Sequence, residues 1–272
     1  MTLSDSALIN VSRVLETGQS QFFTPPADPG FYLTRAKILN RSEFFYRFRD
    51  LPAQTAALGV CEDGLPVLFD LVNPDGGPLL VVGEDPAANS SLLQFMVQSA
   101  VTLNSPAEVR YAAICNRPAE WDSLAGMTDS PQHCLGIYGN YDRAAEKAIQ
   151  RIASIAEQRQ TGRQAGPAIL LVLDDLAAVQ EMDFEARISL EWLLINGPAS
   201  QIWPVASLPT QKTTDVAPWL AHFKILVSGW MPAAYQDVLD LAPGLDASRL
   251  SPGRQFAAWA QQSWLKFWLP QD

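Results

Sequence analysis

Residues 78–91 read PLLVVGEDPAANSS, and the pattern of this stretch indicates the fold. An apolar run typical of a buried strand leads through a short polar segment into an apolar run with helical spacing. Loops placed in this way hold phosphate in many nucleotide-binding proteins, with the usual spelling G-x-x-x-x-G-K-[ST]. Gly83 and Ser90 occupy the outer positions, whereas Ala88 and Asn89 replace the second glycine and the lysine. The stretch therefore predicts a nucleotide site, a former nucleotide site, or an ordinary strand-to-helix turn.

The composition narrows the class of protein. The chain has 272 residues, of which 48% are hydrophobic and 18% charged, as in a globular protein with a sizeable core. Its formal net charge is −10, so charge alone gives no reason to expect a nucleic-acid partner. Three separated cysteines and two histidines predict free thiols and no zinc site. We find no signal-peptide pattern and no apolar run of about 18 residues, so we expect a cytoplasmic protein without a membrane span.

The alternation of segments predicts the architecture. Apolar strand-like runs such as LLVVG, VRYAAIC and AILLVLD alternate with helix-like runs, as in α/β proteins with a mostly parallel sheet and helices on both faces. Residues 56–272 carry this pattern. Residues 1–55 are rich in proline and aromatic side chains, and we interpret them as an N-terminal extension that packs on the main domain or on a neighbouring subunit.

Two predicted strands end in residues with binding chemistry. In an open parallel sheet, ligands bind beyond the carboxyl ends of the strands. The run LLVVG ends in the polar loop, and the run LLVLDD ends in Asp174 and Asp175. A loop after one strand and an acid after another are the two parts of a P-loop nucleotide site, in which a hydroxyl and a carboxylate hold Mg²⁺.

The order and spacing of these segments resemble the motor domain of the FtsK/SpoIIIE branch of the FtsK–HerA P-loop ATPases. The resemblance covers residues 56–272 and is carried by three runs: ALGVCEDGLPVLFDL before the first parallel strand, AILLVLDDLAAV as the second acidic motif, and LEWLLINGPASQIWPVASLPT as the helix and sensor strand. It implies a P-loop fold and, for an intact member, binding of Mg-ATP and action on DNA. Nucleic acid as a partner is suggested by this resemblance alone.

The resemblance also implies roles for single residues. Ser90 and Asp174 stand where the family holds Mg²⁺, and Asp175 stands where a glutamate polarises the attacking water. The nucleotide-binding loop would consist of the positions from the end of the strand to the start of the helix, namely Gly83, Ala88, Asn89, Ser90 and Ser91.

Several positions depart from the family pattern. Asn89 removes the mobile cation, Pro86 removes a backbone donor, and Glu84 and Asp85 add carboxylates where phosphates would lie. Ser207 and Leu208 replace a Thr-Gln pair, which predicts the loss of a polar sensor. Pro198 stands where an arginine serving the neighbouring subunit is expected.

Two hypotheses follow. The first is a catalytically inactive ATPase-like protein without a cofactor, which has a structural or regulatory role and binds a protein partner or copies of itself. The second is a DNA-dependent ATPase with an atypical loop, or a switch that binds nucleotide without turnover; Asp174 and Asp175 would then be catalytic. At the local level, Asn89 or Ser90 caps a helix, or Asp85 starts one with Pro86 as its first residue.

Overall fold

The computed structural model describes residues 11–12, 39–127, 131–239, 241–260 and 263–272. These residues form one sheet of 11 strands in the order β1-β3-β2-β11-β10-β9-β4-β8-β7-β5-β6. The strands are β1 (Val11–Ser12), β2 (Thr55–Cys61), β3 (Pro66–Asp70), β4 (Leu79–Gly83), β5 (Val109–Cys115), β6 (Cys134–Gly139), β7 (Ala168–Asp174), β8 (Ile202–Pro209), β9 (Ile225–Ser228), β10 (Gln255–Ala260) and β11 (Ser263–Trp268).

The strands from β9 to β6 in this order pair in parallel, whereas the strands from β1 to β10 pair antiparallel with their neighbours. The parallel part confirms the predicted α/β class. Its inner strands β4, β7 and β8 are buried along their whole length, which explains their almost unbroken apolar sequences.

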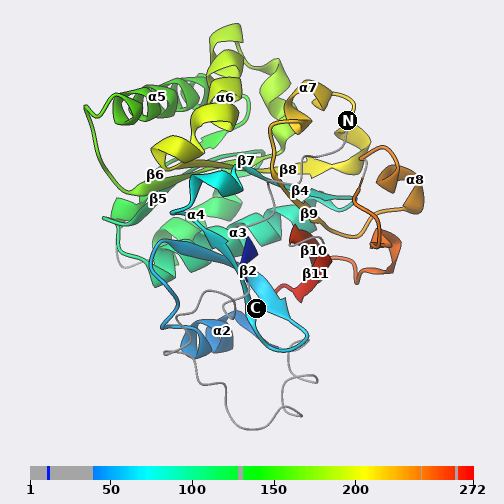
Figure 1. Ribbon diagram of the computed structural model, residues 1–272. Coiled ribbons are helices and arrows are strands. Elements are labelled where there is room, and N and C mark those ends of the chain that lie inside the picture. The colour runs from blue at the N-terminus through cyan, green and yellow to red at the C-terminus, as the bar shows by residue number, and fades with distance from the viewer. Residues whose placement is uncertain (1–10, 13–38, 128–130, 240, 261–262) are drawn as a thin grey trace.

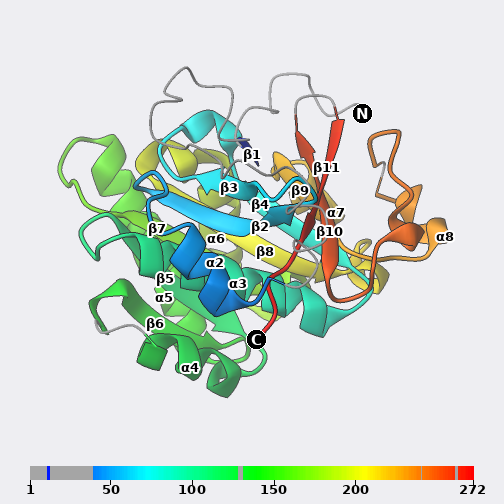
Figure 2. The same ribbon diagram turned by 90° about the horizontal axis from the view of Figure 1, so that it is seen from below.

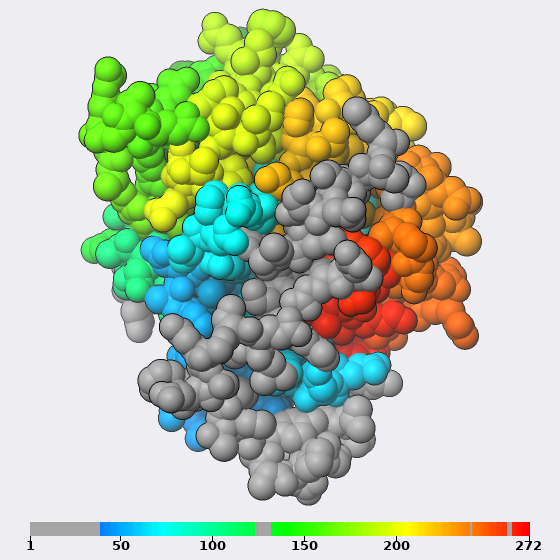
Figure 3. Space-filling model, viewed as in Figure 1, coloured from blue at the N-terminus to red at the C-terminus, as the bar shows by residue number. Residues whose placement is uncertain are grey.

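Helices cover both faces of the sheet (Figure 1). They are α2 (Arg41–Arg47), α3 (Pro86–Leu103), α4 (Pro118–Met127), α5 (Arg143–Gln160), α6 (Phe184–Asn196), α7 (Ala217–Leu220) and α8 (Ala233–Gln236). Helices α5, α6 and α7 lie on the upper face, and α5 and α6 form the top of the molecular surface (Figure 3). Helices α2, α3 and α4 lie below and face the viewer in Figure 2.

Helix α3 is buried on more than the one side that its sequence predicts. Leu92, Met96 and Ala100 are fully buried, as the spacing indicates, but Phe95 and Ser99 are buried as well. Strand β2 packs against α3, since the Ser99 hydroxyl contacts the backbone of Ala57 in that strand. The helix therefore lies between structural layers, which is typical of a helix that is apolar on most sides.

The carboxyl-terminal segment forms an antiparallel hairpin of β10 and β11, which joins the parallel strands to β2 and β3. Most of the sequence SWLKFWLP, from Ser263 to Trp268, forms β11. Its Phe267 stacks on Phe256 with ring centroids 6.0 Å apart, and both rings are buried. Trp259 and Trp264 contact each other but are only partly buried.

Most of the predicted N-terminal extension, residues 1–10 and 13–38, lies outside the described residues. Within the described part, a reciprocal capping contact between Asn40 and Glu43 starts α2. Phe44 and Phe48 of this segment belong to the same apolar core as α3, with the rings of Phe44 and Phe95 5.1 Å apart. The role of residues 1–55 stays a prediction. No helix in the described part of the chain is long and apolar enough to cross a bilayer.

Candidate functional site

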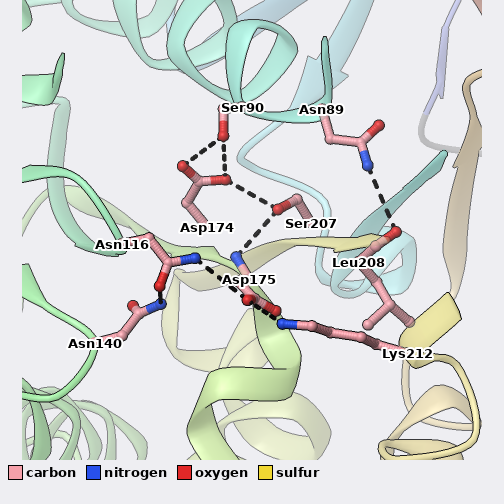
Figure 4. A network of polar contacts seen from close by, with 9 residues as sticks. All are labelled: Asn89, Ser90, Asn116, Asn140, Asp174, Asp175, Ser207, Leu208 and Lys212. Carbon is pink, nitrogen blue, oxygen red and sulfur yellow. Dashed lines mark hydrogen bonds and ion pairs between the residues drawn. The ribbon is translucent and has the colours of Figure 1, made fainter. Parts of the chain in front are cut away.

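The candidate site lies at the carboxyl edge of the parallel strands. Register places Asp174, the last residue of β7, beside Ser207 of β8 and beside Cys115, the last residue of β5. Gly83, the last residue of β4, pairs with Pro209 at the same edge. The acids and the predicted loop thus lie at one edge of the sheet, as the sequence predicts (Figure 4).

Asp174 is the centre of a hydrogen-bonded network. The hydroxyl of Ser90, in the first turns of α3, lies 2.6 and 2.7 Å from the two carboxylate oxygens. The Ser207 hydroxyl donates at 3.0 Å, and the indole Nε1 of Trp121 in α4 donates at 3.3 Å. Burial raises the pKa of Asp174, and the nearby Asp175 charge adds to this, although the three donors act in the opposite direction.

Asp175 has an unusual backbone conformation. Its φ of 103° and ψ of 85° lie in a region that residues with a side chain rarely adopt. The backbone N–H donates to Ser207 Oγ at 3.1 Å, and Lys212 Nζ lies 2.7 Å from Oδ2. Asn116 also donates to Oδ2 at 3.3 Å, whereas Oδ1 is buried and has no hydrogen-bond partner among the residues that the structure describes. Backbone strain of this kind collects at functional sites and persists where surrounding contacts hold it.

Besides Trp121, three members of this network were not predicted from the sequence: Lys212, Asn116 and Asn140, whose amide donates to Asn116 at 2.9 Å. Each follows a strand end, of β8, β5 and β6 respectively, by one to three residues. Polar residues just after parallel strands were therefore a usable signal. The predicted loss of a polar sensor stays a prediction, although the Ser207 hydroxyl contacts both acids. A serine at that position keeps a hydroxyl at the strand end even though the usual residues are absent.

The segment between β4 and α3 is short. Helix α3 begins at Pro86, and its N-cap is Asp85, whose side chain accepts from the Ala87 N–H at 2.9 Å. Of the local alternatives, the one with Asp85 before Pro86 is therefore confirmed. Only Glu84 and Asp85 lie between the strand and the helix, so four of the predicted loop positions (Ala88, Asn89, Ser90 and Ser91) are helical.

The side chains of these four helical residues point to different surroundings. Asn89 is 1% exposed, and its Nδ2 donates to the carbonyl oxygens of Gly83 and Leu208 at 3.2 and 3.5 Å. Ala88 is buried. Ser91 donates to the Ala87 carbonyl and has no contact with the acids. Ser90 is the one that the fold brings to Asp174, as Figure 4 shows.

A small hollow lies beside this segment. The hollow between Gly83, Asn89, Gly229 and Phe256 has a volume of about 10 Å³, close to the space of one water molecule. The Glu84 carboxylate is held by Thr210 and Gln211. Among the described residues, no group of three or more His, Cys, Asp or Glu side chains could hold a metal ion.

We compared the chain with known proteins. No protein-family model matches it, and no curated protein sequence matches it either. Several solved structures are similar to the chain. EssC (ATPases 2 and 3) from Geobacillus thermodenitrificans has a TM-score of 0.65 and 16% identity, over 92% of this chain and 48% of EssC. EccC (ATPases 2 and 3) of Thermomonospora curvata, in complex with a signal sequence peptide, has a TM-score of 0.60 and 15% identity, over 86% and 43%.

The pCW3 conjugation coupling protein TcpA, in its monomer form with ATPγS, has a TM-score of 0.64 and 14% identity, over 87% of this chain and 70% of TcpA. The chain spans less than half the length of the EssC and EccC chains. At this level of identity the likeness concerns the fold. The fold is that of a P-loop ATPase domain, as in the EssC and EccC structures.

Proposed function

We propose that the chain is a catalytically inactive protein with the fold of the FtsK–HerA ATPases, and that it has a structural or regulatory role in a protein assembly. The observation that carries this proposal is the state of Asn89. It stands in place of the phosphate-binding lysine, it is 1% exposed, and its amide hydrogens face protein carbonyl oxygens. An amide in this position brings no positive charge to a terminal phosphate.

The phosphate half of the site does not fit a triphosphate. A phosphate loop needs several free backbone N–H groups around an open space. Here the segment is reduced to Glu84 and Asp85, both carboxylates, and the hollow beside it has about 10 Å³. Like charges this close to a triphosphate would repel it. We therefore propose that Mg-ATP is not a cofactor of this protein.

An assembly role is supported by the surface of α6. Phe184, Ile188 and Ile195 are 67%, 48% and 57% exposed, and their spacing places them along one side of the helix. Exposed apolar groups that gather on one face are typical of protein interfaces. The similar EccC structure holds a peptide, so this fold can bind a protein ligand. We propose a protein partner or a second copy of the chain as the occupant.

Titration calorimetry with Mg-ATP tests the proposal, together with phosphate release measured with and without double-stranded DNA. We expect no saturable heat and no release above the buffer blank at high protein concentration. Micromolar affinity with steady phosphate release would overturn it. Light scattering over a concentration series, with Phe184→Ser and Ile188→Ser combined, tests self-association: the variant is expected to be more monomeric than the original chain.

A second candidate function is a nucleotide-binding switch or DNA-dependent ATPase, and one observation favours it. Asp175 Oδ1 is buried and lacks a hydrogen-bond partner in the described part of the chain, and Ser90 and Asp174 have the side-chain types that hold Mg²⁺. When bound, Mg²⁺ would supply positive charge next to a nucleotide. In this case Lys212, already 2.7 Å from Asp175, is the cation that replaces the missing lysine. DNA-stimulated hydrolysis that Asp174→Ala and Lys212→Gln both abolish would support this function over the first.

A further inference from the structure

A second hollow lies at the opposite edge of the sheet from the acids. It is lined at its base by the first residues of β6 and β7 and by Arg110 near the start of β5, and at its side by the last turns of α5 and residues 164–167. Its volume is about 300 Å³, at the lower end of the range for small-molecule sites. We call it the Arg110 cavity, with the lining residues Arg110, Leu135, Ile155, Arg159, Pro167 and Ile169.

The cavity combines two guanidinium groups with an apolar wall. Leu135, Ile155 and Ile169 are aliphatic, and Arg110 and Arg159 are the charged residues in its lining. No ion pair among the described residues involves either arginine. This is unusual in a chain with 29 acidic and 19 basic residues, in which an acidic neighbour would be expected by composition. Within the described part of the chain, the two cations are thus left without a counter-charge.

The two arginines are anchored differently. Arg159 donates from Nη1 to the Ser200 carbonyl at 3.0 Å and from Nη2 to the Pro167 carbonyl at 2.9 Å. Its buried Nε has no hydrogen-bond partner in the described ranges. Burial lowers the pKa of Arg159, which reflects an incompletely compensated charge. Arg110 bonds only through Nε, to the Pro106 carbonyl at 3.2 Å. Its two terminal nitrogens have no partner among the described residues, so they form a free fork.

We propose that the Arg110 cavity binds a small organic carboxylate with a short aliphatic chain. A guanidinium fork matches the two oxygens of a carboxylate, and the aliphatic wall gives the rest of such a molecule an apolar surface. A single free fork fits one negative charge better than a triphosphate, which needs several donors. The site is independent of the acids at the other edge, so the proposal does not depend on the proposed function.

Hexanoate is the probe that we would use, followed through the arginine Nε resonances in nitrogen-15 spectra at constant ionic strength. We expect saturable shifts of the Arg110 and Arg159 signals at millimolar hexanoate. Hexanamide, which has the same chain without the charge, should bind at least about tenfold more weakly. Arg110→Gln should weaken hexanoate binding to a similar degree, whereas Arg151→Gln, a change of equal charge at an exposed position of α5, should leave it unchanged.

Three results would overturn the proposal: no saturable shift with hexanoate, equal shifts with hexanamide, or an Arg110→Gln variant that binds as the original does. Inorganic phosphate binding as tightly as hexanoate would also overturn it, because the aliphatic wall would then contribute nothing. The comparison of hexanoate with hexanamide uses the unaltered protein, so it gives a result even if the variant does not fold.

Discussion

Restoring the missing lysine is the sharpest test of how the segment after β4 is built. In an intact phosphate loop, Asn89→Lys would be expected to improve nucleotide binding. Here the Asn89 side chain is 1% exposed. Its Oδ1 lies so close to Gly83 that a Cβ atom added to this glycine would be only 2.7 Å from it. A longer side chain has no free space on that side. We therefore expect the substitution to disturb the fold and not to create a site.

The magnitude follows from two costs. The hydrogen bond from Asn89 to the Gly83 carbonyl contributes about 1 kcal/mol. Overpacking of a closely packed position costs about 1–3 kcal/mol, and removing an ammonium from water acts in the same direction. Together, Asn89→Lys should lower the free energy of unfolding by about 2–4 kcal/mol. In a domain of this size that corresponds to a fall in Tm of at least about 4 °C.

The assay is thermal and urea unfolding followed by circular dichroism, repeated with Mg-ATP. Two controls separate the causes. Asn89→Ala removes the hydrogen bond without adding volume or charge, so it should cost less than Asn89→Lys. Ala87→Lys adds the same charge at an exposed position two residues before Asn89. It should lower the free energy of unfolding by at most about 1 kcal/mol. If Asn89→Lys is as stable as Ala87→Lys and Mg-ATP raises its Tm, the packing argument is refuted.

Four further predictions concern the acid network and a buried thiol. Ser90→Ala should lower the free energy of unfolding by about 1.5–3 kcal/mol, since it removes a donor from a buried carboxylate; Ser91→Ala, with its exposed hydroxyl, should change it little in the same urea titrations. Asp174→Asn should gain stability relative to the original protein as the pH rises. Because the pKa of Asp174 is raised in the folded state, the original protein loses stability as the pH rises from the ordinary carboxyl pKa to the raised one. The prediction is refuted if the free energies of unfolding of the two proteins change with pH by equal slopes. Lys212→Gln should lower the free energy of unfolding by about 1–2 kcal/mol; this value is below that of a fully buried ion pair because the Lys212 side chain is 44% exposed. An unchanged urea midpoint would show that the ion pair does not stabilise the fold. Burial raises the pKa of Cys115 to about 12, so mass spectrometry should find it unmodified by iodoacetamide at pH 8 until guanidinium unfolds the chain; rapid modification of the native protein would contradict this.

Local signals in the sequence were enough for the helix start after β4. Asp85 before Pro86 is a strong start signal, because the aspartate accepts from an otherwise unpaired N–H and the proline lacks one. The same signal shortens the loop, which the spelling of the P-loop motif alone does not reveal. The family pattern favours a longer loop here, whereas the Asp85-Pro86 pair favours a helix start. The structure has the helix start at Pro86.

Contacts across the sheet were not predictable in the same way. Lys212 reaches Asp175 over 37 positions, and Ser90 reaches Asp174 over 84. The resemblance implied the second pair, whereas the position of Lys212 just after a parallel strand indicated its edge of the sheet but not its partner. The Arg110 cavity likewise combines residues from β5, β6, α5 and the loop before β7, whose spacing in the chain is irregular.

By itself, the sequence determined the parallel α/β core and the edge of the sheet where its acids lie. The spacing of apolar residues predicts the strands and helices, and the polar residues that follow each strand mark this edge of the sheet. Only the tertiary structure decided which groups those acids contact, and that Asn89 turns its amide to protein carbonyls. The physical reason is that the register between strands distant in the chain fixes these contacts, and a buried polar atom must take whichever partners that register brings within reach.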